Sequence, residues 1–185
     1  YTLEKYEESL AALDFAIIAD DSFMGAYFDK GKVLEKLGKY EDAIKNYETT
    51  LTLNDTNAHA YLRIGKCYEK IEKYDVARHY YYNTVHEDPQ LDKGWLAIAD
   101  FHYKLEEYPE ALYHINKAIA IDEENSRYWK KVAKIHAALH HWKEADLAYK
   151  KTVDLGNYDI DLWQKWAEVL ENKGDSNAAI HVLQQ

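Results

Sequence analysis

Apolar residues recur along the chain in two alternating helical stripes. In the stretch 160–173, Trp163, Trp166, Ala167 and Leu170 follow spacings of three, one and three residues, which places them on one face of an α-helix. A second stripe, with spacings of three and four residues, begins at Tyr40. Both stripes return along the chain, and together they predict helices near residues 24–37, 40–53, 58–71, 74–87, 92–105, 108–121, 126–139, 142–155, 160–173 and 176–185.

The stripes repeat every 34 residues without an insertion. The period is clearest at the aromatic residues Tyr40, Tyr74, Tyr108 and Trp142. We number each unit so that these aromatics occupy unit position 17. Position 4 then carries a large residue, positions 8 and 20 small residues, and position 24 mostly a large one. The chain divides into full units at 24–57, 58–91, 92–125 and 126–159, and partial units at 1–23 and 160–185.

Each unit is predicted to form a helical hairpin whose two stripes face each other. Small residues at positions 8 and 20 let the helices approach closely, and Gly38 and Gly174 suit the turn between them. A single hairpin cannot bury its apolar stripes, so neighbouring units stack. Tyr1 falls at unit position 12, so we expect the chain to open inside a mostly missing first helix and to be a fragment of a longer array.

This pattern resembles the tetratricopeptide repeat (TPR), and we expect an array of the bacterial type. The resemblance covers the whole chain and departs from the family pattern at Lys30 and Ser176. It implies an all-α, right-handed α-solenoid of stacked antiparallel helix pairs. It further implies that unit positions 2, 5, 9, 12 and 13 of each first helix, called the groove face below, line a concave groove.

Charge on the groove face runs against the charge of the whole chain. The chain has a formal net charge of −10, yet the groove face of the four full units carries nine basic and three acidic side chains. Ordinary surface pairing, such as Lys32 with Glu35, is the alternative explanation. The predicted peptide-binding residues on this face are Phe28, Lys32, Lys66, Lys93, Leu96, Tyr103, Arg127, Lys130 and Lys134.

The sequence offers little catalytic chemistry. It has no phosphate loop, dinucleotide glycine pattern, nucleophile elbow or His-Glu-x-x-His motif. His136, His140 and His141 could hold a metal by spacing, but packing and turn roles explain them better. Cys67 lies beside the core stripe and is interpreted as a small core residue rather than a reactive thiol. We therefore expect no enzyme activity, no cofactor and no metal.

The leading functional hypothesis is a protein interaction scaffold that binds an acidic peptide in the groove, centred on the fourth and fifth units. The alternatives are structural assembly through the repeat ends and a regulatory array attached to an enzyme elsewhere in a longer chain. The acidic balance argues against nucleic acid, and no apolar run is long enough for a membrane. One cysteine leads us to expect a cytoplasmic protein.

Weak self-association is a further expectation for this stretch of sequence. The second unit should be poorly covered around Tyr27, Val33 and Leu37, and the last unit should expose Trp163, Trp166 and Val182. Open repeat ends can stack on other copies.

Overall fold

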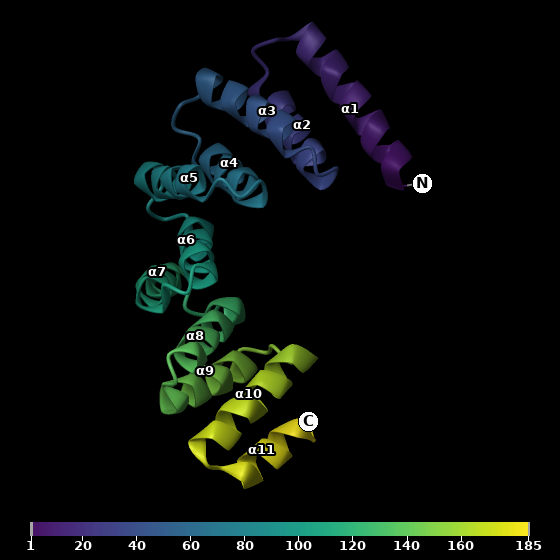
Figure 1. The fold of residues 1–185 in the computed structure, drawn as a ribbon. Helices are drawn as coiled ribbons and strands as arrows, with labels where there is room; N and C mark the ends of the chain where they lie inside the picture. Colours follow the sequence, from purple (N-terminus) through teal and green to yellow (C-terminus); the bar gives the residue numbers. More distant parts are fainter. Residues whose placement is uncertain (1, 185) are drawn as a thin grey trace. The chain divides into compact units, whose positions relative to one another are not determined.

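The computed structural model describes residues 2–184, and this part of the chain is all-helical (Figure 1). Its helices follow one another in consecutive pairs after a first single helix. They are α1 (Thr2–Ala19), α2 (Met24–Lys36), α3 (Tyr40–Leu53), α4 (Ala58–Lys70), α5 (Tyr74–Glu87), α6 (Asp92–Lys104), α7 (Tyr108–Ile121), α8 (Ser126–Ala138), α9 (Trp142–Asp154), α10 (Ile160–Lys173) and α11 (Ser176–Leu183).

The helix positions confirm the prediction from α2 onward, with ends that differ by at most two residues. At the start of the chain, residues 2–5 belong to α1, where the repeat phase alone would place the end of a first helix. Glu4 and Lys5 have high helix propensity, which favours helix over a turn at these positions.

The turn inside each hairpin from α2/α3 to α10/α11 has one backbone conformation. The residue at unit position 15 is left-handed in every case, with φ between 58° and 90°, and these residues are Gly38, Glu72, Glu106, His140 and Gly174. The next residue donates its N–H to a carbonyl five residues earlier, as Lys39 does to Leu34 at 2.9 Å. This helix ending favours glycine, so three of the turns carry the strain of a side chain.

Small residues bring the two helices of each hairpin together, as the pattern predicted. The alanines at unit position 20 are at most 1% exposed, and they are Ala43, Ala77, Ala111, Ala145 and Ala179. Glycine is required at position 8 of α2 and α4. A Cβ atom at Gly31 would lie 2.6 Å from the ring of Tyr47, and one at Gly65 would lie 2.7 Å from the ring of Tyr81.

The chain forms two compact units, residues 1–94 and residues 95–185. In the first, one core cluster joins Leu34, Ala43 and Tyr47 with Ile64 and Cys67. In the second, a larger cluster of buried residues extends from Ala99 to Val169 and includes residues of every helix from α6 to α10.

The last hairpin is better covered than the sequence suggested. Val182 is only 6% exposed and packs with Ala167, Leu170 and Ala179, so the prediction that it is exposed is wrong. The hairpin buries this residue by itself, because α11 lies directly against α10. The predicted open residues Trp163, Trp166, Tyr27, Val33 and Leu37 are half-buried.

Candidate functional site

The acidic residues on the groove face of α2 and α4 are held by neighbouring side chains. Glu35 accepts a hydrogen bond from the Tyr47 hydroxyl at 3.0 Å and forms an ion pair with Arg63 of α4 at 3.2 Å. Glu69 accepts a hydrogen bond from the Tyr81 hydroxyl at 2.6 Å. Burial, together with the nearby Glu35 carboxylate, raises the pKa of Tyr47, so its hydroxyl remains a donor. These contacts engage both carboxylates within the protein.

The cations on the same face are more open to solvent. Lys36, Lys66 and Lys70 are exposed. Lys32 forms an ion pair with Asp29 at 2.8 Å rather than with Glu35, so the proposed alternative pairing is wrong for this lysine. The groove face of α2 and α4 therefore presents positive charge.

Phe28 adds an apolar surface beside these cations. The Phe28 ring is half-buried, and its centroid lies 5.4 Å from the ring centroid of Tyr47. The Nζ atom of Lys32 lies 5.8 Å from the centroid of the Phe28 ring. The predicted residues Phe28 and Lys32 are thus in contact with each other.

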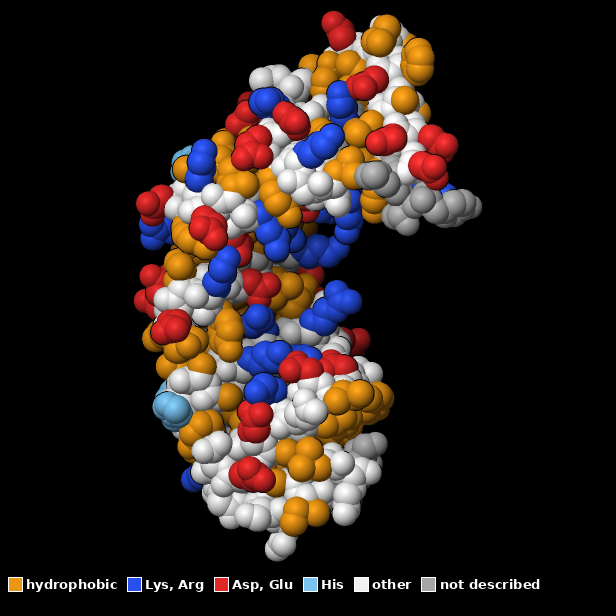
Figure 2. Space-filling model, turned by 45° about the vertical axis from the view of Figure 1, so that its right-hand side comes forward, with side chains coloured by type: hydrophobic (Ala, Val, Ile, Leu, Met, Phe, Trp, Pro, Cys, Tyr) orange, Lys and Arg blue, Asp and Glu red, His pale blue; other side chains and the backbone are white. Residues whose placement is uncertain are grey.

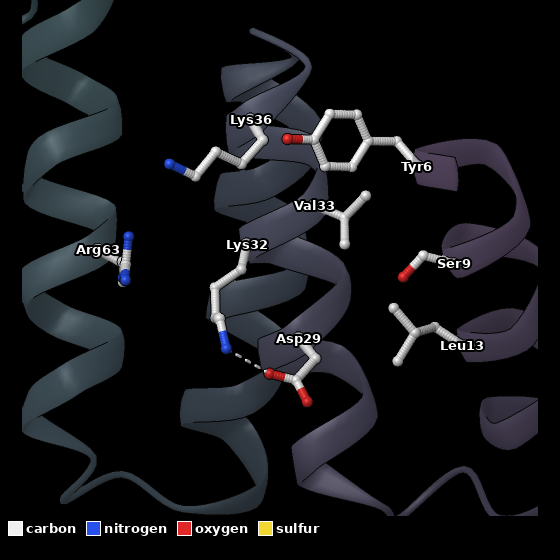
Figure 3. A pocket seen from close by; sticks show the side chains of 8 residues that line it. All are labelled: Tyr6, Ser9, Leu13, Asp29, Lys32, Val33, Lys36 and Arg63. Atoms are coloured by element: carbon white, nitrogen blue, oxygen red, sulfur yellow. Dashed lines mark hydrogen bonds and ion pairs between the residues drawn. The ribbon is translucent and has the colours of Figure 1, made fainter. Parts of the chain in front are cut away.

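A pocket of about 390 Å³ lies between α1 and α2. Tyr6, Ser9 and Leu13 of α1 point toward Val33 of α2 across this space (Figure 3). The charged residues that line it are Asp29, Lys32 and Lys36 of α2 and Arg63 of α4. Sequence reasoning did not identify this pocket, although the three α1 residues occupy unit positions 17, 20 and 24.

In the compact unit of residues 95–185, two of the predicted groove lysines form ion pairs with carboxylates of the same chain. The Nζ atom of Lys130 lies 2.7 Å from Asp159 and 2.9 Å from Asp161, and that of Lys134 lies 2.9 Å from Asp161. Figure 2 shows blue and red side chains lying next to one another in the lower part of the view. Hydrogen bonds from Lys134 and Lys130 lower the pKa of Asp161 to about 2. Partial burial opposes the shift at Lys130, but its hydrogen bonds to Asp159 and Asp161 raise its pKa.

These ion pairs also support the local fold. Asp159 is the N-cap of α10, where its side chain accepts a hydrogen bond from the backbone N–H of Leu162 at 2.8 Å. Reversing the charge of Lys130 and Lys134 would therefore disturb the start of α10 as well as the groove face. A change of ligand binding in such a variant would not isolate a binding role.

The remaining predicted groove residues, Lys93, Leu96 and Arg127, differ in how exposed they are. Arg127 is exposed and lines a pocket of about 300 Å³ together with Lys130, Lys131 and Lys134. Leu96 is half-buried against the core cluster. Lys93 is exposed near the start of α6.

Lys131 was missed because it lies outside the groove-face positions. It occupies unit position 6, forms an ion pair with Asp100 at 2.6 Å, and has its Nζ atom 4.8 Å from the centroid of the predicted residue Tyr103. Arg63, the partner of Glu35, occupies the same unit position in α4. In both contacts, an acidic residue at unit position 9 or 12 of one hairpin's first helix meets a cation at unit position 6 of the next hairpin's first helix. This spacing is the sequence signal that would have identified them.

The structure describes the surroundings of the histidines and of the cysteine that the sequence singled out. His136 and His141 approach each other with 3.4 Å between their Nδ1 atoms. Within residues 2–184, no group of three or more His, Cys, Asp or Glu side chains is placed to hold a metal ion. Cys67 is fully buried, and burial raises the pKa of its thiol to about 12. Across the same residues, no helix has the length and apolarity to cross a bilayer.

The hairpin geometry and the repeat phase agree with a comparison to known families. Residues 7–185 match the family described as Cilia and flagella-associated protein 70 C-terminal domain, a TPR family. The chain belongs to this family. No match was found among curated proteins. The finer expectation of a bacterial-type array stays a prediction for this family member.

Solved structures show that this family member shares its fold with other TPR proteins. MamA is 21% identical with a TM-score of 0.76, and the match covers 87% of this chain and 88% of MamA. YrrB, described as a TPR protein with an unusual peptide-binding site, is 18% identical with a TM-score of 0.73 and coverages of 94% and 89%. The type IV pilus biogenesis factor PilW is 15% identical with a TM-score of 0.84 and coverages of 97% and 83%. The chain is therefore an all-α repeat protein of the α-solenoid class.

Proposed function

We propose that this TPR array is a non-catalytic scaffold that binds an acidic segment of another protein on the groove face of α2 and α4. Peptide binding by the structurally similar YrrB supports a peptide as the ligand. The family name associates the related protein with cilia and flagella, so partners are to be sought first among proteins of these organelles.

One observation carries the proposal. Arg63 pairs with Glu35, the hydroxyls of Tyr47 and Tyr81 hold the Glu35 and Glu69 carboxylates, and Lys36 and Lys70 are exposed on the same face. A carboxylate of a ligand that approaches this face meets exposed cations beside the Phe28 ring. Each exposed ion pair is worth only about 0.2–1 kcal/mol, so affinity comes from several pairs together with apolar anchors. Binding should therefore be modest and should weaken with salt.

The test is fluorescence anisotropy with a labelled peptide that alternates Glu with Leu and Phe, measured at low and high salt. The double variant Lys36→Glu/Lys70→Glu reverses two exposed charges on the groove face, and we expect it to weaken binding about tenfold, or about 1.4 kcal/mol. The matched control is Lys143→Glu/Lys150→Glu, which makes the same change at exposed positions of α9.

The control variant should bind within about twofold of the unmodified chain, because α9 is not part of the groove face. Equal weakening in both double variants would mean that overall charge, rather than a site, controls binding. That outcome, or no binding by the unmodified chain at low salt, would reject the proposal.

A further inference from the structure

We propose that the Tyr149 hydroxyl and the Lys165 ammonium group form a binding subsite for a glutamate or aspartate side chain of a bound protein segment. Tyr149 lies on α9 and Lys165 on α10, and both belong to the compact unit of residues 95–185. The inference rests on the scaffold function proposed above in that its ligand is a protein segment. It concerns a second site, which uses none of the groove-face residues of α2 and α4.

The hairpins α2/α3 and α4/α5 show what a tyrosine at unit position 24 does. The Tyr47 hydroxyl donates a hydrogen bond to Glu35, at unit position 12 of the paired helix, at 3.0 Å. The Tyr81 hydroxyl does the same to Glu69 at 2.6 Å. Arg63, at unit position 6 of α4, forms an ion pair with the Glu35 carboxylate at 3.2 Å. A hydroxyl of one hairpin and a cation of the next hairpin therefore hold one carboxylate on the groove face.

The hairpin α8/α9 has the same two holding groups beside it but lacks the carboxylate. Tyr149 is at unit position 24, like Tyr47, and Lys165 is at position 6 of the following helix, like Arg63. Position 12 is Ala137, whose side chain ends at Cβ. Within residues 2–184, no group accepts a hydrogen bond from the Tyr149 hydroxyl, although this residue is only 1% exposed. The hydroxyl is not fully enclosed, so an acceptor atom of a ligand can reach it.

Tyr149 and Lys165 share three neighbours on the groove face, Tyr103 of α6 and Asp161 and Glu168 of α10. Burial, and after it the charges of these neighbours, raises the pKa of Tyr149, so its hydroxyl stays protonated and remains a donor. The hydrogen bond to Glu168 raises the pKa of Lys165, and Asp161 and Tyr103 add to this effect. The hydroxyl and the ammonium group are therefore directed to the same part of the groove face.

The charges around the subsite favour an anionic acceptor. Asp161 already forms ion pairs with two lysines of α8, at 2.9 Å each. Glu168 forms an ion pair with Lys165 at 2.9 Å, and since both side chains are about half exposed, this pair is weak. An ammonium group has three N–H donors, and Glu168 engages at most two of them. A ligand carboxylate can therefore accept from Lys165 and Tyr149 together, and it attracts the cation more strongly than an amide oxygen does.

The binding test is an NMR titration of the chain labelled with ¹⁵N, using the peptide acetyl-Leu-Glu-Leu-amide. We expect saturable shifts of the backbone amide signals of Ala137 and Lys165. The same peptide with glutamine in place of glutamate should bind about fivefold more weakly, because it lacks the charge. Tyr149→Phe removes only the hydroxyl and should weaken binding of the glutamate peptide by about fivefold, and Lys165→Met should weaken it similarly.

Matched control variants change the same chemical groups elsewhere. Tyr113→Phe removes a hydroxyl from a side chain of α7 that is 58% exposed, and Lys143→Met removes a charge from an exposed position of α9. Both variants should bind the glutamate peptide as the unmodified chain does. Far-UV circular dichroism checks that every variant is folded.

A second measurement needs no ligand. Ala137→Glu supplies a carboxylate from the chain itself at unit position 12, so this variant should no longer bind the glutamate peptide. In a double-mutant cycle followed by urea denaturation, Tyr149→Phe should raise the equilibrium constant of unfolding about fivefold more in the Ala137→Glu background than in the unmodified chain. The Tyr149 ring packs in one core cluster with Ala133, where α2 and α4 have glycine, so the cycle also tests whether its hydroxyl still reaches position 12.

Three results would overturn the inference. Equal binding of the glutamate and glutamine peptides would mean that no carboxylate is selected. Unchanged peptide binding by Tyr149→Phe, or no coupling in the cycle, would mean that the hydroxyl does not serve this site. Sodium acetate that causes the same shifts with the same affinity would mean that the site takes a free carboxylate rather than a protein segment. Lys36→Glu/Lys70→Glu lies in the other compact unit and should leave the titration unchanged, so a failure here leaves the site on α2 and α4 standing.

Discussion

Replacing Gly65 by alanine tests whether the Tyr81 ring sets the close approach of α4 and α5. The added Cβ atom would lie 2.7 Å from Cδ1 and 2.8 Å from Cε1 of Tyr81. Carbon atoms that are not bonded normally approach to about 3.5–4.0 Å. The ring is 1% exposed and its hydroxyl is bound to Glu69, so it cannot move aside without losing this hydrogen bond.

The magnitude follows from three contributions. Overpacking of a core costs about 1–3 kcal/mol. Loss of the hydrogen bond between Tyr81 and Glu69 adds about 0.5–1.5 kcal/mol. The better helix propensity of alanine offsets about 1 kcal/mol of this. We therefore expect Gly65→Ala to lower the free energy of unfolding by about 0.5–3.5 kcal/mol.

Urea denaturation followed by far-UV circular dichroism measures this change. The control is Gly25→Ala in α2, where a Cβ atom would meet only the far end of the exposed Phe23 ring, at 3.0 Å. This variant should be as stable as the unmodified chain or more stable. The reasoning is refuted if Gly65→Ala is as stable as the control.

A second substitution probes the role of the hydrogen bond. In α8, Ala133 and Ala137 occupy the positions of Gly65 and Glu69, and the facing Tyr149 is still buried at 1% exposure. A tyrosine without the acidic partner can therefore accept alanine. Gly65→Ala combined with Glu69→Ala should lose less stability than the sum of the two single variants.

Two further changes follow from the described geometry. Glu106 has a left-handed φ of 61° at an exposed turn. Glu106→Gly should therefore raise the free energy of unfolding, measured by urea titration, by about 1 kcal/mol. A loss of stability would show that the turn is not strained. Burial, with a smaller effect of His102, lowers the pKa of His114 from 6.5 to about 4. The unfolded chain then binds more protons between these values, so stability should fall by up to about 3 kcal/mol as the pH drops from 6.5 to 4, and His114→Phe should flatten this slope. An unchanged slope in the variant would assign the acid sensitivity to other groups.

The hairpins were predictable because each unit repeats the same small and large residues that a close helix contact requires. Ala43 and Ala111 lie 68 residues apart, and both are fully buried because the same close helix contact recurs around them. The turns at Glu72 and His140 were harder to predict, because neither residue is a usual choice for a left-handed backbone. There the packing of the hairpin, rather than local preference, decides the conformation.

The site was less predictable than the fold. Helical phase correctly places Lys130 and Lys134 on one face of α8, but it does not say what the next helix brings to that face. Asp159 and Asp161 come from the start of α10 and engage both lysines. The distance between side chains on different helices depends on how the helices are offset along each other, which a repeat pattern does not contain.

The distribution of strained turns affects where local unfolding occurs along the array. In a linear series of coupled repeats, local unfolding depends on the intrinsic stability of each repeat and on the contact energy with its neighbours. The hairpins α2/α3 and α10/α11 turn at Gly38 and Gly174 and have no side-chain strain there. The hairpins between them store strain at Glu72, Glu106 and His140. Backbone amides around Glu72, Glu106 and His140 should therefore exchange with solvent more readily through local opening than those around Gly38 and Gly174.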